Sequence, residues 1–277
     1  MKIGFIGAGN MGGAIIRGYL NNNTAITSGR GKKKTNDPET IFVYDSDPGK
    51  VDILKNDGLD IEAAESISRL AWNSDILVLC VKPNVIDEVL NELAAYDKLF
   101  ISIAAGISTD HIKKKLGPDK KVVRVMPNTP AMVGEGMSAL SASENVTEED
   151  RIIVEKLFST VGFAMWVPEE MMDIVTGISG SSPAYAYLYI EGLVNAGVEG
   201  GLSEEAATIF AAQSTLGAAQ MVLKNLGDVD PRQLCVNVCS PGGTTIEAVK
   251  VLEKDGFTDT ICKAAKASAA KSKLMTR

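Results

Sequence analysis

Short apolar runs alternate with helix-like patterns over the first 167 residues. Lys2–Ile6 is apolar and β-prone, and Asp75–Val81 is almost continuously apolar, which suits a parallel strand buried on both faces. Further strands are predicted at Thr40–Tyr44, Leu99–Ala104 and Lys121–Val125, and helices at Ala14–Leu20, Val51–Asp57, Val85–Leu93 and from Thr147, capped with the help of Asp150, to about Phe158. Because strands and helices alternate, residues 1–167 are predicted to form an α/β domain, a Rossmann-type doubly wound parallel sheet.

From residue 168 to residue 277 the pattern is helical throughout, which predicts an all-helical second domain. One helical face carries Tyr185, Leu188, Tyr189, Gly192, Leu193 and Ala196. The next helix is predicted to start after Ser203, an N-cap residue followed by Glu204 and Glu205, and it is small or apolar around its whole circumference. A domain of about 110 residues has little interior to cover such a helix, so a second copy of the chain is expected to cover it in a homodimer.

The stretch Asn21–Glu39 is polar and basic and breaks the alternating pattern. Its Asn, Gly, Ser, Thr, Lys and Pro residues predict an exposed, mobile loop. We interpret the cluster Lys32-Lys33-Lys34 as a solvated part of that loop rather than a phosphate site.

Composition narrows the functional classes. The chain has 277 residues, 45% hydrophobic and 23% charged, which is ordinary for a globular protein with room for two domains. Its net charge of −7 argues against binding to nucleic acid or to an anionic membrane. No apolar run approaches the ~20 residues of a bilayer span and no signal peptide is recognisable, so we expect a cytoplasmic protein.

The cysteines and the single histidine limit the chemistry. The four cysteines, Cys80, Cys235, Cys239 and Cys262, lack the spacing of a metal site and are expected to be reduced thiols, with Cys80 in the core. His111 lies in a polar, helix-like stretch and is interpreted as solvated. No metal is therefore expected, and the chemistry has to proceed without a histidine acid or base.

A glycine-rich motif follows the first predicted strand and precedes the first predicted helix. Gly7, Gly9 and Gly12 have the G-x-G-x-x-G spacing of dinucleotide-binding turns: the first makes the tight turn, the second lets a pyrophosphate approach, and the third lets helix pack on strand. The free N–H groups at the helix start then face the phosphates. The expected coenzyme-binding residues here are Ile6, Gly7, Ala8, Gly9, Asn10, Met11 and Gly12.

The end of the second predicted strand bears on the choice of coenzyme. Asp45 is placed to bond the adenosine ribose hydroxyls, which is typical of NAD sites, whereas Ser46 and Lys50 offer groups for the 2′-phosphate of NADP. Both coenzymes therefore stay open, and Asp45 and Ser46 are expected to bind either one.

Two further strands end where open α/β sheets place their ligands. Lys82-Pro83 stops one strand, and the small residues Ala104-Ala105-Gly106 follow another. Val81, Lys82, Pro83, Ala104, Ala105 and Gly106 are accordingly expected to line the coenzyme.

The segment Ser240-Pro241-Gly242-Gly243-Thr244-Thr245 has the character of an anion site. Pro241 suits the first turn of a helix, and the glycines let the backbone approach a ligand. A helix start with the hydroxyls of Ser240, Thr244 and Thr245 would fit a carboxylate, although a simple helix start capped by serine explains the same residues. Val249 and Leu252 are expected to face inward.

The chain resembles the pyrroline-5-carboxylate reductases over essentially its whole length. The resemblance is carried by four segments: Val81-Lys82-Pro83, Arg124 to Pro130 (RVMPNTP), Ser179 to Tyr185 (SGSSPAY) and Ser240 to Thr245 (SPGGTT). It implies reduction of L-1-pyrroline-5-carboxylate to L-proline, the last step of proline biosynthesis, with NADPH or NADH. It also implies a Rossmann domain followed by a helical domain (168–277) that binds substrate and interlocks two copies, and decamers in some members.

The resemblance implies roles for individual residues. Thr245 would be catalytic by bonding the ring nitrogen of the substrate, and Ser240, Gly243, Thr244 and Glu169 would complete the substrate site. Asn237 would lie near the nicotinamide, with Lys82, Pro83, Ala104 and Ala105 along the coenzyme.

Imine reduction agrees with the scarcity of histidine. A protonated cyclic imine is already electrophilic, so hydride transfer needs mainly alignment, whereas reduction of a ketone commonly uses a histidine acid. Two alternatives stay open. A β-hydroxyacid-type dehydrogenase would need a lysine that Tyr185–Gly201 lacks, and a non-catalytic NAD(P)-binding sensor would not need Ser240 and Thr245.

Overall fold

The computed structural model describes residues 1–27 and 40–277, with side chains for residues 1–21 and 40–277. They form two compact units, one of Met1–Gly180 with Ser268–Arg277 and the other of Ser181–Ala267. The domain boundary expected between residues 167 and 168 stays a prediction.

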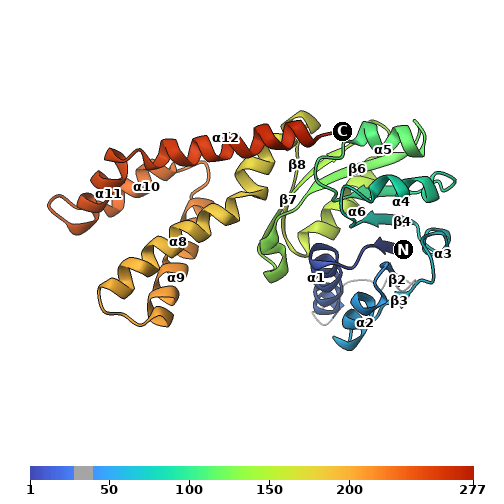
Figure 1. Ribbon diagram of the computed structural model, residues 1–277, viewed down its shortest axis with the longest axis horizontal. Coiled ribbons are helices and arrows are strands. Elements are labelled where there is room, and N and C mark those ends of the chain that lie inside the picture. Colours follow the sequence, from blue (N-terminus) through green and yellow to red (C-terminus); the bar gives the residue numbers. More distant parts are fainter. Residues whose placement is uncertain (28–39) are drawn as a thin grey trace. The chain divides into compact units, whose positions relative to one another are not determined.

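A mostly parallel sheet of eight strands forms the first unit (Figure 1). The strands lie in the order β3-β2-β1-β4-β5-β6-β7-β8, and neighbours run parallel except β6 and β7. Their bounds are β1 (Lys2–Ile6), β2 (Thr40–Tyr44), β3 (Glu62–Ala63), β4 (Ile76–Leu79), β5 (Leu99–Ser102), β6 (Lys121–Met126), β7 (Gly136–Ala142) and β8 (Gly162–Trp166). The predicted Rossmann-type sheet is thereby confirmed, with one antiparallel pair that was not foreseen.

Three of the strands, β3, β7 and β8, were not predicted from the sequence. β3 consists of two exposed residues beside β2, and β7 carries two serines among glycine and apolar residues. In β8 every second residue is partly buried, and the residues between them, Phe163 and Met165, are exposed. The five predicted strands all form, and β4 is shorter than its apolar run.

Helices cover both faces of the sheet, because alternate residues of each strand point to opposite faces. Ile3 and Val78 belong to one apolar core, and Ile6 and Leu79 to the other. The helices of the first unit are α1 (Asn10–Thr27), α2 (Pro48–Asn56), α3 (Ile67–Asn73), α4 (Ile86–Leu93), α5 (Thr109–Leu116), α6 (Glu148–Ser159) and α7 (Met172–Val175), with the short helices η1 (Thr129–Val133), η2 (Glu169–Met171) and η3 (Thr176–Gly180). α1, α2 and α6 pack on the first core, and α3, α4 and α5 on the second.

The first helix is longer at both ends than predicted. It begins at Asn10, directly after the glycine turn, and continues to Thr27, so the expected loop is wrong for residues 21–27. Extending a formed helix costs much less than starting one, so residues of low propensity can continue it. The rest of the expected loop, with Lys32, Lys33 and Lys34, lies outside the described residues.

Local capping sets the other helix starts. α2 begins at Pro48 rather than Val51, because the Asp47 side chain accepts a hydrogen bond from the Gly49 N–H at 3.1 Å and proline suits the first turn. α6 begins after Thr147 in a capping box with Asp150, which confirms the predicted start.

The second unit is helical, as predicted for this part of the chain. It contains α8 (Ser182–Glu199), α9 (Glu204–Lys224), α10 (Pro231–Val238), α11 (Thr244–Lys254) and most of α12 (Phe257–Met275), whose residues from Ser268 onward belong to the first unit. Ser203 caps α9 as expected, accepting a bond from the Ala206 N–H. α8 and α9 pack closely, since a Cβ on Gly197 would lie 2.9 Å from the Ala207 Cβ.

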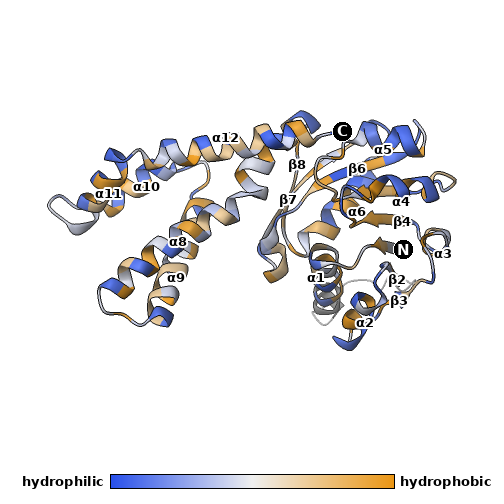
Figure 2. Ribbon diagram, in the orientation of Figure 1, coloured by the Kyte–Doolittle hydropathy of each residue, from blue (hydrophilic) through white to orange (hydrophobic). Residues whose placement is uncertain are grey.

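Much apolar surface of this unit is exposed in the single chain, and Figure 2 shows apolar residues along α8 and α9. Leu188 and Phe210 are each 67% exposed, and only Ala207 and Ala211 of α9 are buried. Leu252 is 41% exposed, which corrects the expectation that it faces inward. α9 has the length and hydropathy of a membrane span, contrary to the expectation that no run approaches one, but length and composition alone are a weak sign of a span.

Candidate functional site

A cleft lies at the carboxyl ends of the central strands in the first unit. β1 lies between β2 and β4, so the chain order reverses there, and open α/β sheets bind ligands at such a point. The cleft has a volume of about 480 Å³ and is lined by Ile6, Gly7, Gly9, Tyr44, Asp45, Ser46, Lys50, Ile67, Cys80, Val81, Lys82, Val85, Glu88, Val89 and Glu92. Seven of the expected coenzyme-binding residues therefore meet here: Ile6, Gly7, Gly9, Asp45, Ser46, Val81 and Lys82.

The three glycines differ in what surrounds them. Gly7 has a φ of +104°, and a Cβ there would lie 2.5 Å from the Cys80 carbonyl oxygen. A Cβ on Gly12 would lie 2.3 Å from the Gly7 carbonyl oxygen, whereas one on Gly9 would meet no atom within 4 Å. Gly7 and Gly12 are thus required by the fold itself, and Gly9 leaves open space at the start of α1, which fits the approach of a dinucleotide pyrophosphate.

Asp45 joins the end of β2 to the glycine turn. One carboxylate oxygen accepts a hydrogen bond from the Ala8 N–H at 2.7 Å, and the other accepts bonds from the Asp47 N–H at 2.9 Å and the Lys50 ammonium at 3.1 Å. Burial by itself raises the pKa of Asp45, but these bonds outweigh it and hold the pKa below its usual value. The carboxylate is therefore ionised and fixed in position at the rim of the cleft.

One wall of the cleft was not foreseen from the sequence. This wall is formed by α4 and the residue just before it, through Val85, Glu88, Val89 and Glu92. Their spacing of three, one and three residues is that of a single helical face. The periodicity that predicted this helix could therefore also have indicated which of its residues share a face. Tyr44, Ile67 and Cys80 contribute through the neighbouring β2, α3 and β4 segments.

Other expected coenzyme residues lie outside the cleft lining, namely Ala8, Asn10, Met11, Gly12, Pro83, Ala104, Ala105 and Gly106. Gly106, in the loop after β5, has a φ of +71° and accepts a hydrogen bond from the Arg277 N–H at 2.9 Å. Ser108 binds the Arg277 carbonyl oxygen in return, through its hydroxyl at 2.5 Å. The last residues of the chain thereby hold this loop, and a coenzyme role for it stays a prediction.

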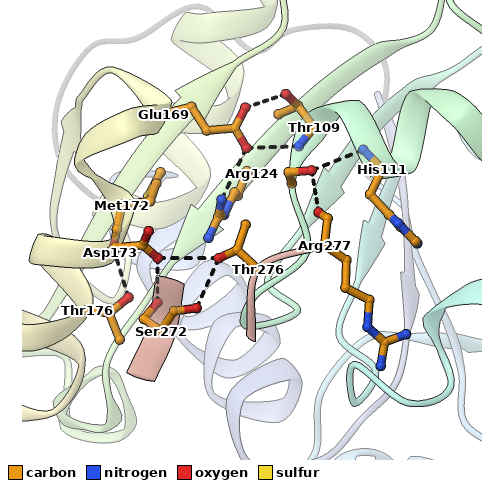
Figure 3. A network of polar contacts seen from close by, with 11 residues as sticks. Thr109, His111, Arg124, Glu169, Met172, Asp173, Thr176, Ser272, Thr276 and Arg277 are labelled. Carbon is orange, nitrogen blue, oxygen red and sulfur yellow. Dashed lines mark hydrogen bonds and ion pairs between the residues drawn. The ribbon is translucent and has the colours of Figure 1, made fainter. Parts of the chain in front are cut away.

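Glu169 lies in a polar network of the first unit (Figure 3). Its carboxylate accepts hydrogen bonds from the Thr109 N–H at 2.9 Å, the Thr109 hydroxyl at 2.5 Å and the Arg124 guanidinium at 3.2 Å. Beside this cluster, Asp173 accepts a bond from the Ser272 hydroxyl at 2.7 Å. Glu169 therefore ties η2 to the start of α5 and to β6, and its predicted contact with substrate stays a prediction.

His111 is not solvated as expected. Its side chain is 18% exposed, and its Nε2 lies 2.6 Å from the Asp87 carboxylate on α4. The hydrogen bond to His111 lowers the pKa of Asp87. All four cysteines are free thiols, and burial raises the pKa of the Cys80 thiol, which therefore stays protonated at the cleft.

The predicted substrate residues of the second unit surround the start of α11. Gly243 is the N-cap residue of this helix, so no side chain of the N-cap occupies the N–H groups of the first turn. Pro241 and Gly242 lie in the turn before the helix, with a φ of +71° at Gly242, which corrects the placement of Pro241 in the first helical turn. Ser240, Thr244 and Thr245 flank the same helix start, with Thr245 half-buried.

Asn237 lies on α10, also in the second unit. Its side-chain oxygen accepts a hydrogen bond from the Gln233 amide at 2.8 Å. Its predicted place near the nicotinamide stays a prediction.

Two family models match the chain, one on each side of residue 168. The model described as pyrroline-5-carboxylate reductase dimerisation matches residues 169–275, and the model described as NADP oxidoreductase, coenzyme F420-dependent, matches residues 2–106. The glycine turn and all the residues that line the cleft lie within residues 2–106, and the start of α11 lies within residues 169–275.

Similar proteins extend the match to the whole chain. The pyrroline-5-carboxylate reductase of Escherichia coli (strain K12) is 43% identical over 266 residues, covering 95% of this chain and 94% of that protein. A pyrroline carboxylate reductase crystal structure from Plasmodium falciparum with NADP bound is 36% identical, with a TM-score of 0.84, covering 100% of this chain and 98% of that one. The structure of a pyrroline-5-carboxylate reductase from Coxiella burnetii is 35% identical, with a TM-score of 0.87 and coverage of 99% and 98%. On identity over the full length and on the shared fold, this chain belongs to the pyrroline-5-carboxylate reductase family.

Proposed function

We propose that this chain reduces L-1-pyrroline-5-carboxylate to L-proline, the last step of proline biosynthesis, with NADH or NADPH as the coenzyme. The observation that carries the proposal is the open space at Gly9, in a cleft at the reversal point of the sheet, in a chain 43% identical to a pyrroline-5-carboxylate reductase.

The first unit supplies the coenzyme site. The N–H groups at the start of α1 and the open side of Gly9 would receive the pyrophosphate, and Asp45 with Ser46 would meet the adenosine ribose. Val81 and Lys82 line the continuation of the cleft past β4. When bound, the reduced nicotinamide supplies the hydride.

The start of α11 supplies the substrate site. The first-turn N–H groups and the hydroxyls of Ser240 and Thr244 suit the substrate carboxylate, because a helix N-terminus carries partial positive charge. The Thr245 hydroxyl would bond the ring nitrogen. A protonated imine needs no strong acid from the protein, so a neutral threonine is sufficient.

The helical second domain is proposed to join two copies of the chain. Leu188 and Phe210 leave large apolar side chains exposed, and residues 169–275 match a dimerisation model. A homodimer would cover such surface. We also propose that the dimers assemble further into a decamer. We further propose a cytoplasmic location without nucleic-acid or membrane partners, which the net charge of −7 and four free thiols support.

A direct assay tests the activity. Purified protein is mixed with pyrroline-5-carboxylate and either NADH or NADPH, and consumption of the reduced coenzyme is followed together with formation of proline. Stoichiometric formation of proline is expected. Coenzyme binding without turnover would instead indicate an NAD(P)-binding sensor, and turnover only with a β-hydroxyacid would indicate the other dehydrogenase class.

A further inference from the structure

We propose that this chain selects NADH over NADPH and that the Asp45 carboxylate determines the selection. The inference rests on the proposed function in one respect, namely that the cleft beside β1 and β4 holds the coenzyme.

Asp45 is held where a carboxylate meets an adenosine ribose in this fold. It is the residue directly after β2, its side chain is 7% exposed, and it lines the cleft next to Gly7 and Gly9. A carboxylate has about four lone-pair positions for hydrogen bonds. Ala8, Asp47 and Lys50 occupy three of them, which leaves room for one more donor.

The two coenzymes differ in what they offer this carboxylate. NADH carries a hydroxyl on the 2′ carbon of the adenosine ribose, and a hydroxyl can donate a hydrogen bond to Asp45. NADPH carries a phosphate at that position, which is doubly negative near neutral pH and has no proton to donate. An ionised carboxylate therefore attracts the first and repels the second.

The charges around Asp45 do not compensate for the repulsion. Among the described residues that line the cleft, the carboxylates of Asp45, Glu88 and Glu92 outnumber the ammonium groups of Lys50 and Lys82. Lys50, the cation bonded to Asp45, already balances that carboxylate at 3.1 Å. A 2′-phosphate would therefore enter a site whose net charge is negative.

The test compares binding of NADH and NADPH to the full-length protein without substrate, by fluorescence titration. We expect the wild type to bind NADH more tightly by about tenfold or more, the size of a like-charge contact in a partly exposed site. Asp45→Asn keeps an acceptor for the Ala8 N–H and removes the charge, so the two dissociation constants should come within about threefold of each other or reverse. Asp45→Ser carries the same expectation if Asp45→Asn does not fold.

Asp47→Asn is the matched control. It removes a carboxylate from the same turn, but Asp47 does not line the cleft, and asparagine caps a helix as well as aspartate does. The NADH preference should be unchanged in this variant. Wild-type protein that binds NADPH as tightly as NADH overturns the proposal, and so does an unchanged preference in Asp45→Asn.

The same titration separates this inference from the proposed function. Tighter binding of NADH in a protein that forms no proline would contradict the reductase activity and support the coenzyme preference. Binding of neither coenzyme would overturn the coenzyme site, and the preference with it.

Discussion

The carboxylate of Glu169 lies 3.2 Å from the guanidinium of Arg124, a cation whose side chain is only 7% exposed. The same carboxylate accepts two hydrogen bonds from Thr109 at the start of α5. The sequence resemblance implies a substrate contact for Glu169, which stays a prediction, and these contacts show that it also joins β6, α5 and η2.

Replacing Glu169 should therefore destabilise the protein. Glu169→Ala leaves Arg124 without its carboxylate, and we expect the free energy of unfolding to fall by about 2 kcal/mol, less than for a fully buried pair because Glu169 is 30% exposed. Urea unfolding measures the loss. The exposed neighbour provides the control, since Glu170→Ala should change stability by less than about 0.5 kcal/mol. Wild-type stability in Glu169→Ala would contradict this structural role, and a raised KM for pyrroline-5-carboxylate would support the predicted contact with substrate.

Gly9 and Gly12 should respond to substitution in opposite ways. Gly9→Val places its side chain in open space, so the fold should persist while dissociation constants for NADH and NADPH rise sharply. Gly12→Ala forces a Cβ against the Gly7 carbonyl oxygen, so stability should fall by about 1–3 kcal/mol. Coenzyme titration and thermal unfolding on both variants check the pair. Unchanged coenzyme affinity in folded Gly9→Val would show that the pyrophosphate does not bind at this turn.

Thr245→Val should damage turnover and spare coenzyme binding. The valine keeps the shape of the side chain and leaves the imine nitrogen without its partner, which is worth ~1–3 kcal/mol, or roughly ten- to a hundredfold in kcat/KM. Initial rates against pyrroline-5-carboxylate concentration measure the effect, and a separate coenzyme titration is the internal control. Wild-type kcat/KM in this variant would show that the hydroxyl does not act on the reacting ring.

Because of Asp150, the stability of the first unit should fall as the pH becomes acidic. It accepts bonds from the Lys121 ammonium at 2.8 Å and the Thr147 N–H at 2.9 Å. Burial alone raises the pKa of Asp150, but these bonds lower it below its ordinary value of 3.8. A pKa that is lower in the folded state contributes stability above the unfolded pKa, and this contribution is lost as pH falls through the folded pKa.

The corresponding experiment compares wild type with Asp150→Ala in urea at several pH values. We expect the variant to be less stable by about 1 kcal/mol at pH 7, and the difference to shrink once the pH falls below about 4. Glu149→Ala, an exposed change in the first turn of the same helix, should show a smaller difference. If the difference in free energy of unfolding between wild type and Asp150→Ala were independent of pH, the role of the ionised carboxylate would be contradicted.

Phe210 should be necessary for self-association. It is 67% exposed on α9 in the single chain, so Phe210→Glu puts a charge where we propose a second copy packs. Sedimentation velocity at micromolar concentration should show a dimer or larger form for the wild type and a shift to monomer for the variant. Ile152→Glu makes the same chemical change at an exposed site of α6 in the first unit and should leave the assembly intact. A monodisperse, active wild-type monomer would contradict the proposed dimer.

The sequence by itself determined the elements whose signal is local. Buried parallel strands are continuous apolar runs, so β1, β2, β4, β5 and β6 could be read directly, and capping chemistry marked the starts of α6 and α9. The glycine spacing after Lys2–Ile6 predicted the turn because such a motif is local in sequence: Gly12 packs against the Gly7 carbonyl oxygen, and Gly9 leaves the space for a ligand.

Only the tertiary structure decided what depends on partners distant in the chain. β3, β7 and β8 are paired with neighbouring strands, and of the three only β8 has a continuous apolar sequence. His111 was expected in solvent, but Asp87, 24 residues earlier, pairs with it. Folding of the sheet brings the ends of β1, β2 and β4 together. As a result, one face of α4 lines the cleft, and the Asp45 carboxylate accepts a hydrogen bond from the Ala8 N–H.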